Sequence, residues 1–536
     1  MINRKNFRYT RAETLKTHLW QGYSACRDCR CNTMTSAVFQ HCMGLFFTLL
    51  YILGAYLGPE TIYGTLAEYR IQFVIAILAL IASLPSLREV KLSRLSQTYA
   101  MIGMWVAVLL SYIFNGLGRF AADALLDFLP SALTFFLVLL NCKKKRHLQM
   151  IVFVLLSACL FTIYRGYSAI LAGNFDSPYL ITAHDAAAPF PRLRGVSFIN
   201  DPNDFSQLIA SLIPCLFFFW APKKFPRNFL FVLVPIGILL FGMFLTHSRG
   251  GIIAFLAVVT IAGRRKIGTI PSVIIAGGLF VVATVIGWSG GRDISVGSGA
   301  DRMEAWATGL QLIKSHPLFG VGFQRFAEYY VITAHNTIVV CAAELGVFGL
   351  FFWVMFLIPT IRDTVVASAT AKTAEQLAQE EGKMTPFERA LSVRAAQTNV
   401  MHLEHSRPES TPIAGFDPDP LTSEAKGNVA AVANPYFMND DANTQLPEAE
   451  IRRLARLMMI CLTGFLVAGW FLSRAYVMTL FIYGGMVQVV YRMAAEQNLV
   501  PESMKIPRVL RLSAIGVVGL IAVVYIMLRL QNLTRH

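Results

Sequence analysis

The chain has 536 residues, of which 55% are hydrophobic and 15% charged, and its mean hydropathy is +0.53. A soluble globular protein carries far more charge, so this composition excludes that class and indicates a membrane protein. The net charge of +15 does not indicate nucleic-acid binding, because the basic residues gather in short loops between apolar runs.

Apolar runs recur along the whole chain, about thirteen of them under the usual criterion of roughly 17–25 residues per span. They predict an all-α polytopic membrane protein with about 12–13 transmembrane helices and a large periplasmic loop containing short helices. We expect no cleavable signal peptide, since the first run begins late and is long enough to span. The expected spans lie near residues 38–57, 70–86, 98–115, 125–141, 149–171, 204–220, 229–246, 250–263, 269–288, 337–360, 455–472, 475–492 and 509–529.

The basic residues predict the orientation, because short cytoplasmic loops are enriched in lysine and arginine. This rule places the N-terminal arm, residues 1–37, in the cytoplasm. Alternation then puts loops 172–202 and 289–336 in the periplasm and the polar stretch 361–454 inside the cell. The basic loops contain Arg88, Lys91 and Arg94; Lys143, Lys144, Lys145 and Arg146; Lys223, Lys224 and Arg227; and Arg264, Arg265 and Lys266.

The arm also holds a C-x2-C-x-C cluster formed by Cys26, Cys29 and Cys31. One interpretation is a zinc site completed by His18 or Cys42. The other, which we favour, is a reduced and solvent-exposed arm, because no second Cys/His pair stands at zinc spacing.

The first outer loop carries two cations, Arg192 and Arg194, just before a helix start at Asp201-Pro202. Aspartate is a preferred N-cap and proline a preferred first helical residue. We therefore interpret Asp201 and Asp204 as capping groups rather than catalytic acids.

An outward-facing turn, His247-Ser248-Arg249-Gly250-Gly251, separates two apolar runs. An arginine in an outward-facing turn is unusual under the positive-inside rule, which suggests that it has a specific role. Arg249 either binds a diphosphate or anchors the turn to lipid headgroups.

The second outer loop contains Arg302 after a flexible Gly-Ser-Gly-Ala stretch. Asp301 resembles an N-cap, with Glu304 three residues on as its capping-box partner. This pattern places Arg302 at a helix N-terminus, where backbone N–H groups and the helix dipole favour phosphate. Trp306 belongs to an apolar stripe suited to a helix on the membrane surface. The alternative is an arginine that snorkels to headgroups.

His335 and Asn336 open the next span. The functional interpretation of His335 is a general base that takes a proton from an attacking hydroxyl; the alternative is a capping or packed histidine. On a continuous helix, Gly346 would lie on nearly the same face as His335 and Glu344 on the opposite face. Glu344 is therefore not expected to orient the imidazole.

No metal motif and no phosphate-binding P-loop are visible, so we expect neither a metal nor a cofactor. The expected organisation is a transmembrane core at 38–360, an insertion at 361–454 that is partly disordered, and C-terminal transmembrane helices at 455–536. The insertion has no apolar run long enough for a core, and we assign it no chemistry.

Four blocks together resemble the O-antigen ligase family, which includes related O-antigen and exopolysaccharide polymerases. The resemblance covers about residues 190–355. Family members carry an Arg-x3-Leu element and a His-x10-Gly element in the large periplasmic loop. His335 and Gly346 match the second; Arg302 matches the first, but Trp306 stands where leucine is usual, which leaves ligase and polymerase both open. The blocks are RLRGVSFINDPNDFSQLIASLIP (192–214), THSRGGIIAFLA (246–257), DRMEAWATGLQLIKSHPLFGVGFQRF (301–326) and AHNTIVVCAAELGVFGLFFW (334–353).

The resemblance implies a metal-independent, inverting glycosyltransferase of the bacterial inner membrane, with its active site on the periplasmic face. Its donor would be a glycan on undecaprenyl diphosphate, and its acceptor either lipid A–core sugar in a ligase or another glycan in a polymerase. By this analogy Arg249 and Arg302 hold the diphosphate and His335 deprotonates the acceptor hydroxyl. We expect Arg192, Arg194, Asn336 and Trp306 to contact substrate, and membrane lipids to surround the protein. A glycolipid transporter is a further alternative, disfavoured because few ionisable residues lie inside the spans.

Overall fold

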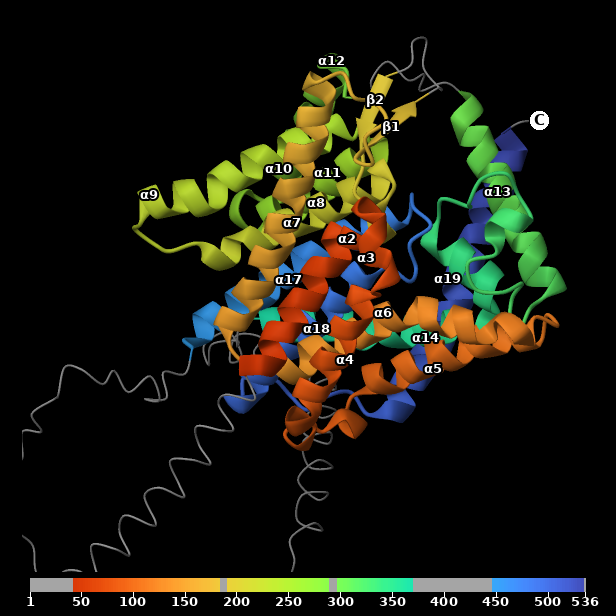
Figure 1. Ribbon diagram of the computed structural model, residues 1–536, viewed down its shortest axis with the longest axis horizontal. Coiled ribbons are helices and arrows are strands. Elements are labelled where there is room, and N and C mark those ends of the chain that lie inside the picture. The colour runs from red at the N-terminus through yellow and green to blue at the C-terminus, as the bar shows by residue number, and fades with distance from the viewer. Residues whose placement is uncertain (1–41, 184–189, 289–295, 370–445, 535–536) are drawn as a thin grey trace, which may run out of the picture. The chain divides into compact units, whose positions relative to one another are not determined.

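The computed structural model describes residues 42–183, 190–288, 296–369 and 446–534 (Figure 1). The chain divides into two compact units. The first comprises Met1–Ser368 together with Glu448–His536, and the second is Ala369–Pro447. The expected arm, with its cysteine cluster, and nearly all of the insertion lie outside the described residues.

The described part is built almost wholly from helices, as the sequence predicts. A helix at Cys42–Leu57 comes first. The α-helices that follow are α2 (Pro59–Ile62), α3 (Gly64–Glu68), α4 (Ile71–Ser83), α5 (Ser96–Ile113), α6 (Ala121–Asn141), α7 (Lys145–Leu171), α8 (Pro202–Leu216), α9 (Phe225–Asn228), α10 (Val234–Leu245), α11 (Arg249–Ile267), α12 (Thr269–Val285), α13 (Val296–Ser315), α14 (Thr337–Ser368), α17 (Glu448–Gly469), α18 (Met478–Glu496) and α19 (Ile506–Thr534). Short helical turns are η1 (Leu84–Arg88), η2 (Leu92–Arg94), η3 (Gly118–Phe120), η4 (Ser197–Ile199), η5 (Phe217–Phe219), η6 (Phe229–Leu233) and η7 (Phe326–Glu328), and the strands are β1 (Leu180–Ala183) and β2 (Phe190–Leu193).

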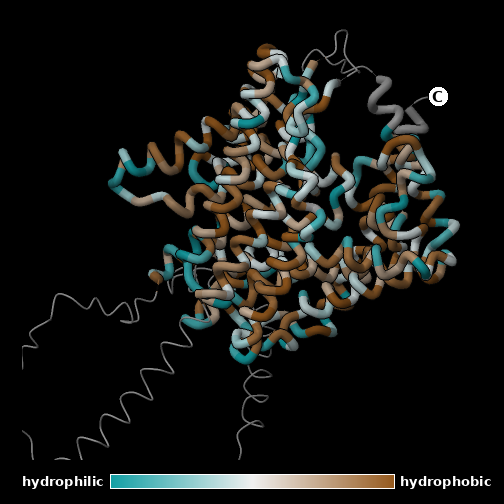
Figure 2. The backbone as a smooth tube through the Cα atoms, viewed as in Figure 1, coloured by the Kyte–Doolittle hydropathy of each residue, from teal (hydrophilic) through white to brown (hydrophobic). Residues whose placement is uncertain are grey.

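Every expected span overlaps a helix, which confirms the all-α polytopic membrane fold. Among the described residues, 7 helices are long and apolar enough to cross a membrane, and two shorter apolar helices accompany them. Figure 2 shows hydrophobic residues throughout these helices. The sequence estimate of 12–13 spans is thus higher than the number that meets both criteria, because α8, for example, has 15 residues and falls short of a span. The 7 are Ile71–Arg88, Ser96–Ile113, Gly118–Asn141, Lys145–Leu171, Phe225–Leu245, Thr337–Ser368 and Ile506–Leu530.

The core lies around α8, α14, α17 and α18. In α8 every residue except Asn203 is buried, and α8 packs on α11 and α17. The contact between α8 and α11 is close: a Cβ on Gly251 would lie 1.7 Å from the Ser206 Oγ. Small residues at such positions let helix backbones approach within a membrane. By contrast, α4, α12 and α19 expose many large apolar side chains, as lipid-facing helices do.

Between α7 and α8, β1 pairs with β2 in antiparallel fashion, Leu180 opposite Leu193 and Ala183 opposite Phe190. The chain then turns through η4 and enters α8. The Asp201 side chain accepts a hydrogen bond from the Asn203 backbone N–H at 2.7 Å, so Asp201 is the N-cap of α8, as expected.

Helix α14 is broken at Gly346, whose φ is 67°. The loop after α13 lies in this break and completes the hydrogen bonds that the kink interrupts. The N–H groups of Val321 and Gly322 donate to the carbonyls of Ala343 and Glu344, at 2.9 and 3.0 Å. In return, the N–H groups of 347 and 348 donate to the carbonyls of residues 317 and 318, at 2.8 and 3.1 Å. The segments His316–Gly322 (HPLFGVG) and Glu344–Gly346 (ELG) therefore lie at the two sides of one backbone junction.

Helix α13 begins at Val296, earlier than the sequence predicts. The expected N-cap at Asp301 is wrong, because the Gly-Ser-Gly-Ala stretch is helical rather than an open loop. Arg302 consequently lies beyond the first turn, and the predicted support from a helix N-terminus is lost. The buried face of α13 is formed by Ala305, Trp306 and Leu312, and it packs mainly on α14.

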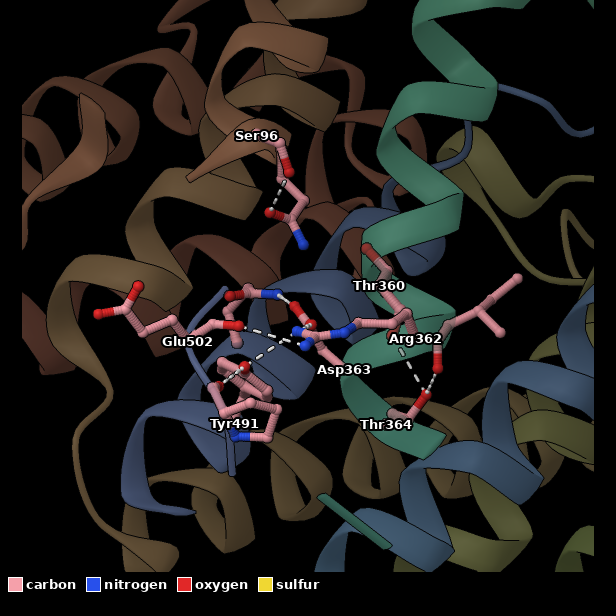
Figure 3. Close-up of polar contacts among 11 residues, drawn as sticks. Ser96, Thr360, Arg362, Asp363, Thr364, Tyr491 and Glu502 are labelled. Carbon is pink, nitrogen blue, oxygen red and sulfur yellow. Dashed lines mark hydrogen bonds and ion pairs between the residues drawn. The ribbon is translucent and has the colours of Figure 1, made fainter. Parts of the chain in front are cut away.

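The far end of α14 carries a polar cluster (Figure 3). Arg362 donates to the Asp363 carboxylate and to the Tyr491 hydroxyl, both at 2.9 Å, and Gln488 of α18 donates to the other Asp363 oxygen at 2.8 Å. These bonds join the ends of α14 and α18. The insertion expected at 361–454 is accordingly shorter than predicted, because residues 361–368 continue α14 and residues 448–454 already belong to α17.

Candidate active site

His335 precedes α14 rather than lying on it. Its φ is 47°, in the left-handed region that a histidine adopts only when surrounding contacts hold it there. One such contact is a hydrogen bond of 2.8 Å from the His335 backbone N–H to the Ser473 Oγ. Because His335 precedes α14, helical phase does not relate its position to that of Glu344, and the two residues line the same cavity.

Ser473 belongs to the loop between α17 and α18, residues 470–477, which we call the α17–α18 loop. The loop is tied to the start of α14, since the Thr337 Oγ1 donates to the Leu472 carbonyl at 2.7 Å and accepts from the Arg474 N–H at 3.2 Å. The Arg474 guanidinium forms an ion pair with Asp204, a buried residue in the first turn of α8. The loop thus brings a cation beside the histidine from more than 130 residues away in sequence.

His335 lines a cavity of about 780 Å³. Polar and aromatic side chains share its wall, which is the usual character of a ligand pocket. Its acidic residues come from three different segments, which are α6, the start of α8 and α14, so the fold assembles the cavity rather than any one motif. The residues that matter below are Asp127, Asp201, Asp204, His335, Glu344, Ser473 and Arg474, together with the aromatic residues Tyr51, Phe198, Phe323 and Tyr476.

The surroundings of His335 lower the pKa of its imidazole to about 4. Burial is the largest cause, and the positive charge of Arg302 is the next; Asp201 acts in the opposite direction and Arg474 in the same one. The imidazole is therefore neutral at physiological pH and able to accept a proton. The same electrostatic coupling places Arg302 near His335, as the sequence interpretation requires.

Trp306 lies next to this histidine in a supporting position. It is 7% exposed, and its indole N–H donates to the Ala334 carbonyl at 2.7 Å. Its ring also meets Trp470 of the α17–α18 loop edge-on, with centroids 6.0 Å apart. Trp306 thus contacts both the residue before His335 and a side chain of the α17–α18 loop.

Arg249 is the first residue of α11, after a Ser248 N-cap whose side chain accepts from the Gly251 N–H. A helix N-terminus is favourable for anions, so the support predicted for Arg302 belongs instead to Arg249. A Cβ on the next residue, Gly250, would lie 3.5 Å from the Phe471 Cβ. The start of α11 therefore adjoins the same α17–α18 loop.

The other residues expected to contact substrate hold the protein itself together. Arg192 is buried, and its Nε donates to the Thr246 carbonyl at 2.9 Å. The Nε of Arg194 donates to the Pro178 carbonyl at 3.1 Å. Asn336 is fully buried and caps α14, since its Oδ1 accepts from the N–H groups of residues 338 and 339 and its Nδ2 donates to the Trp470 carbonyl.

Sequence reasoning missed Ser473 and Arg474 entirely and gave Glu344 no place in the site. Glu344 is 4% exposed, accepts from the Phe326 N–H at 3.2 Å and lines the cavity. The position of Glu344 inside an expected span could have marked it as a candidate site residue, because carboxylates are costly to bury in a membrane. No comparable signal marked Arg474. Within the described ranges, no cluster of three or more His, Cys, Asp or Glu side chains suits a metal ion.

The fold and this cavity define a multi-pass membrane protein with a neutral histidine, nearby arginines and a cavity with polar and aromatic lining. Residues 234–354 match the model of a protein family described as O-Antigen ligase, which confirms the resemblance over that segment. The match supports a membrane protein of polysaccharide biosynthesis, of ligase or polymerase type. The segment includes Arg249, Arg302 and His335, whereas the α17–α18 loop lies outside it. No curated protein matches the chain.

Proposed function

We propose that the protein transfers a glycan from undecaprenyl diphosphate to the hydroxyl of an acceptor sugar, at the periplasmic face of the bacterial inner membrane. The observation that carries the proposal is the neutral, half-buried His335 at the wall of a cavity, with the charge of Arg302 beside it. The proton acceptor and the cation are the two groups that such a displacement needs.

In this mechanism His335 takes the proton from the acceptor hydroxyl as its oxygen attacks the anomeric carbon of the donor. The bond from that carbon to the diphosphate oxygen breaks, and undecaprenyl diphosphate leaves with the bonding electrons. Arg302 and Arg249 stabilise the charge that grows on the leaving oxygen. Attack opposite the leaving group inverts the anomeric configuration.

The direct test is transfer by purified variants. His335→Ala and Arg302→Ala should each reduce transfer by at least about 100-fold, the typical contribution of a general base or a charge-stabilising group. His316→Ala and Arg325→Ala are matched controls, since His316 contacts neighbouring Ser315 and Arg325 pairs with Glu328 at the surface. Normal transfer by His335→Ala would remove the proposed base. Full activity of Arg302→Lys would argue against bidentate phosphate recognition.

The acceptor is tested by deleting the gene in the native host and sizing the glycan left on undecaprenyl diphosphate. Accumulation of long lipid-linked polymer indicates the ligase, and accumulation of single repeat units indicates the polymerase. An unchanged lipid-linked pool with unchanged surface glycan would contradict both.

A further inference from the structure

The charges on the cavity wall distinguish it from a diphosphate site. Four carboxylates line it, those of Asp127, Asp201, Asp204 and Glu344, against one guanidinium, that of Arg474. Arg474 forms an ion pair with Asp204, and the buried Glu344 carboxylate accepts a hydrogen bond from the Phe326 N–H, so Asp127 and Asp201 are the lining acids outside these two contacts. Arg249 and Arg302, the arginines assigned to the diphosphate, are not among the residues that line the cavity.

His335 is thus a cavity residue that is also influenced by a cation outside the cavity lining, Arg302. A general base has to lie between the attacking hydroxyl and the centre that it attacks. With the diphosphate at the arginines, the cavity is left for the acceptor.

The lining residues have the chemistry of a carbohydrate site. Carboxylates accept hydrogen bonds from sugar hydroxyls, and charge-assisted bonds of this kind are stronger than neutral ones. Tyr51, Phe198, Phe323 and Tyr476 provide apolar ring surface beside them. The same carboxylates repel an anionic ligand, which gives specificity by electrostatic complementarity.

We propose that this cavity is the acceptor subsite and that it selects an acceptor sugar without carboxylate or phosphate groups, either a neutral sugar or an amino sugar. The inference rests on the proposed function and adds the class of acceptor. Asp127 is a specificity residue in this subsite, because its exposed side chain is at the mouth of the cavity, where it can meet an incoming sugar before the buried acids do.

The first experiment identifies the sugar that receives the glycan. The product made by the full-length protein in its host is isolated, and linkage analysis with mass spectrometry defines the acceptor residue. A neutral or amino sugar is expected. A uronic acid or a phosphorylated sugar at that position would overturn the inference while leaving the transferase proposal standing, whereas absence of any product would count against both.

The second experiment measures initial rates of transfer by purified Asp127→Asn with that acceptor. The KM for the acceptor should rise about tenfold, equivalent to the loss of one charge-assisted hydrogen bond, with the KM for the donor unchanged. Asp123→Asn is the matched control, because Asp123 lies one turn earlier on α6 and does not line the cavity. Equal acceptor KM values for Asp127→Asn and the control would overturn the role of Asp127.

Discussion

At the scale of single residues, the site depends on how little charge His335 carries. An ordinary histidine is about half protonated at pH 6.5, and the protonated fraction cannot accept a proton. Burial and the neighbouring Arg302 lower the pKa of His335 to about 4. The arginine that we propose to stabilise the leaving group thus also lowers the pKa of the proposed base, so a substitution of Arg302 is expected to change both functions.

This coupling predicts the pH dependence of transfer. Because the base must be neutral, kcat/KM should stay level as the pH falls through 6 and should decline only near pH 4, the lowered pKa of the free protein. Arg302→Gln removes a charge that lowers this pKa, so the acid limb of its residual activity should move to higher pH. Arg302→Lys keeps the charge and should keep the limb in place. A wild-type limb at pH 6.5 would contradict the described environment of His335.

Residue types with strong local rules were predictable from the sequence. Asp201 caps α8 as predicted, whereas the same rule gave a wrong N-cap at Asp301, because α13 begins earlier, at Val296. His335 and Arg302 were found through the motifs that contain them. Arg474 was not, because its role comes from an ion pair with Asp204 across 270 positions of sequence, and no local pattern encodes such a contact.

At the scale of elements, the break in α14 shapes the site. The broken helix and the loop after α13 exchange backbone hydrogen bonds, and the same α14 carries Glu344 into the cavity wall just before the kink. Sequence periodicity predicted one straight helix from residue 337, because periodicity reports apolar faces and not a single residue with positive φ. The extent of α13 was missed because Gly-Ser-Gly-Ala has weak helix propensity, although the stretch belongs to the helix that begins at Val296.

The kink makes Gly346 a stability determinant. Alanine there would be forced to a φ of 67°, and its Cβ would lie 2.3 Å from the Leu318 carbonyl oxygen. Together the strained backbone and the clash should destabilise the protein by about 2 kcal/mol or more and lower the thermal unfolding midpoint in detergent. Gly277→Ala is the control, since a Cβ there meets nothing within 4 Å and alanine favours helix. Equal midpoints for the two variants would show that the junction tolerates a side chain.

At the scale of the whole chain, the site is assembled from segments on both sides of the insertion. Arg249, Arg302 and His335 precede it, whereas Ser473 and Arg474 follow it, and all belong to the compact unit formed by Met1–Ser368 and Glu448–His536. The family match ends at residue 354, so the C-terminal helices supply a part of the site that the matched segment lacks. We therefore expect the C-terminal helices to be needed for the proposed reaction.

This division predicts opposite outcomes for two deletions. Replacing residues 370–445 by a flexible Gly/Ser linker should leave transfer within about threefold of wild type, a change of less than roughly 1 kcal/mol in barrier height, because it removes no described residue of the site. Truncation after residue 445 should abolish transfer, since it removes the loop that holds the His335 backbone through Ser473. Both are measured by complementation of the deletion strain, with membrane levels checked by an epitope tag. Loss of transfer by the linker variant at normal levels would show that the insertion takes part in the reaction cycle.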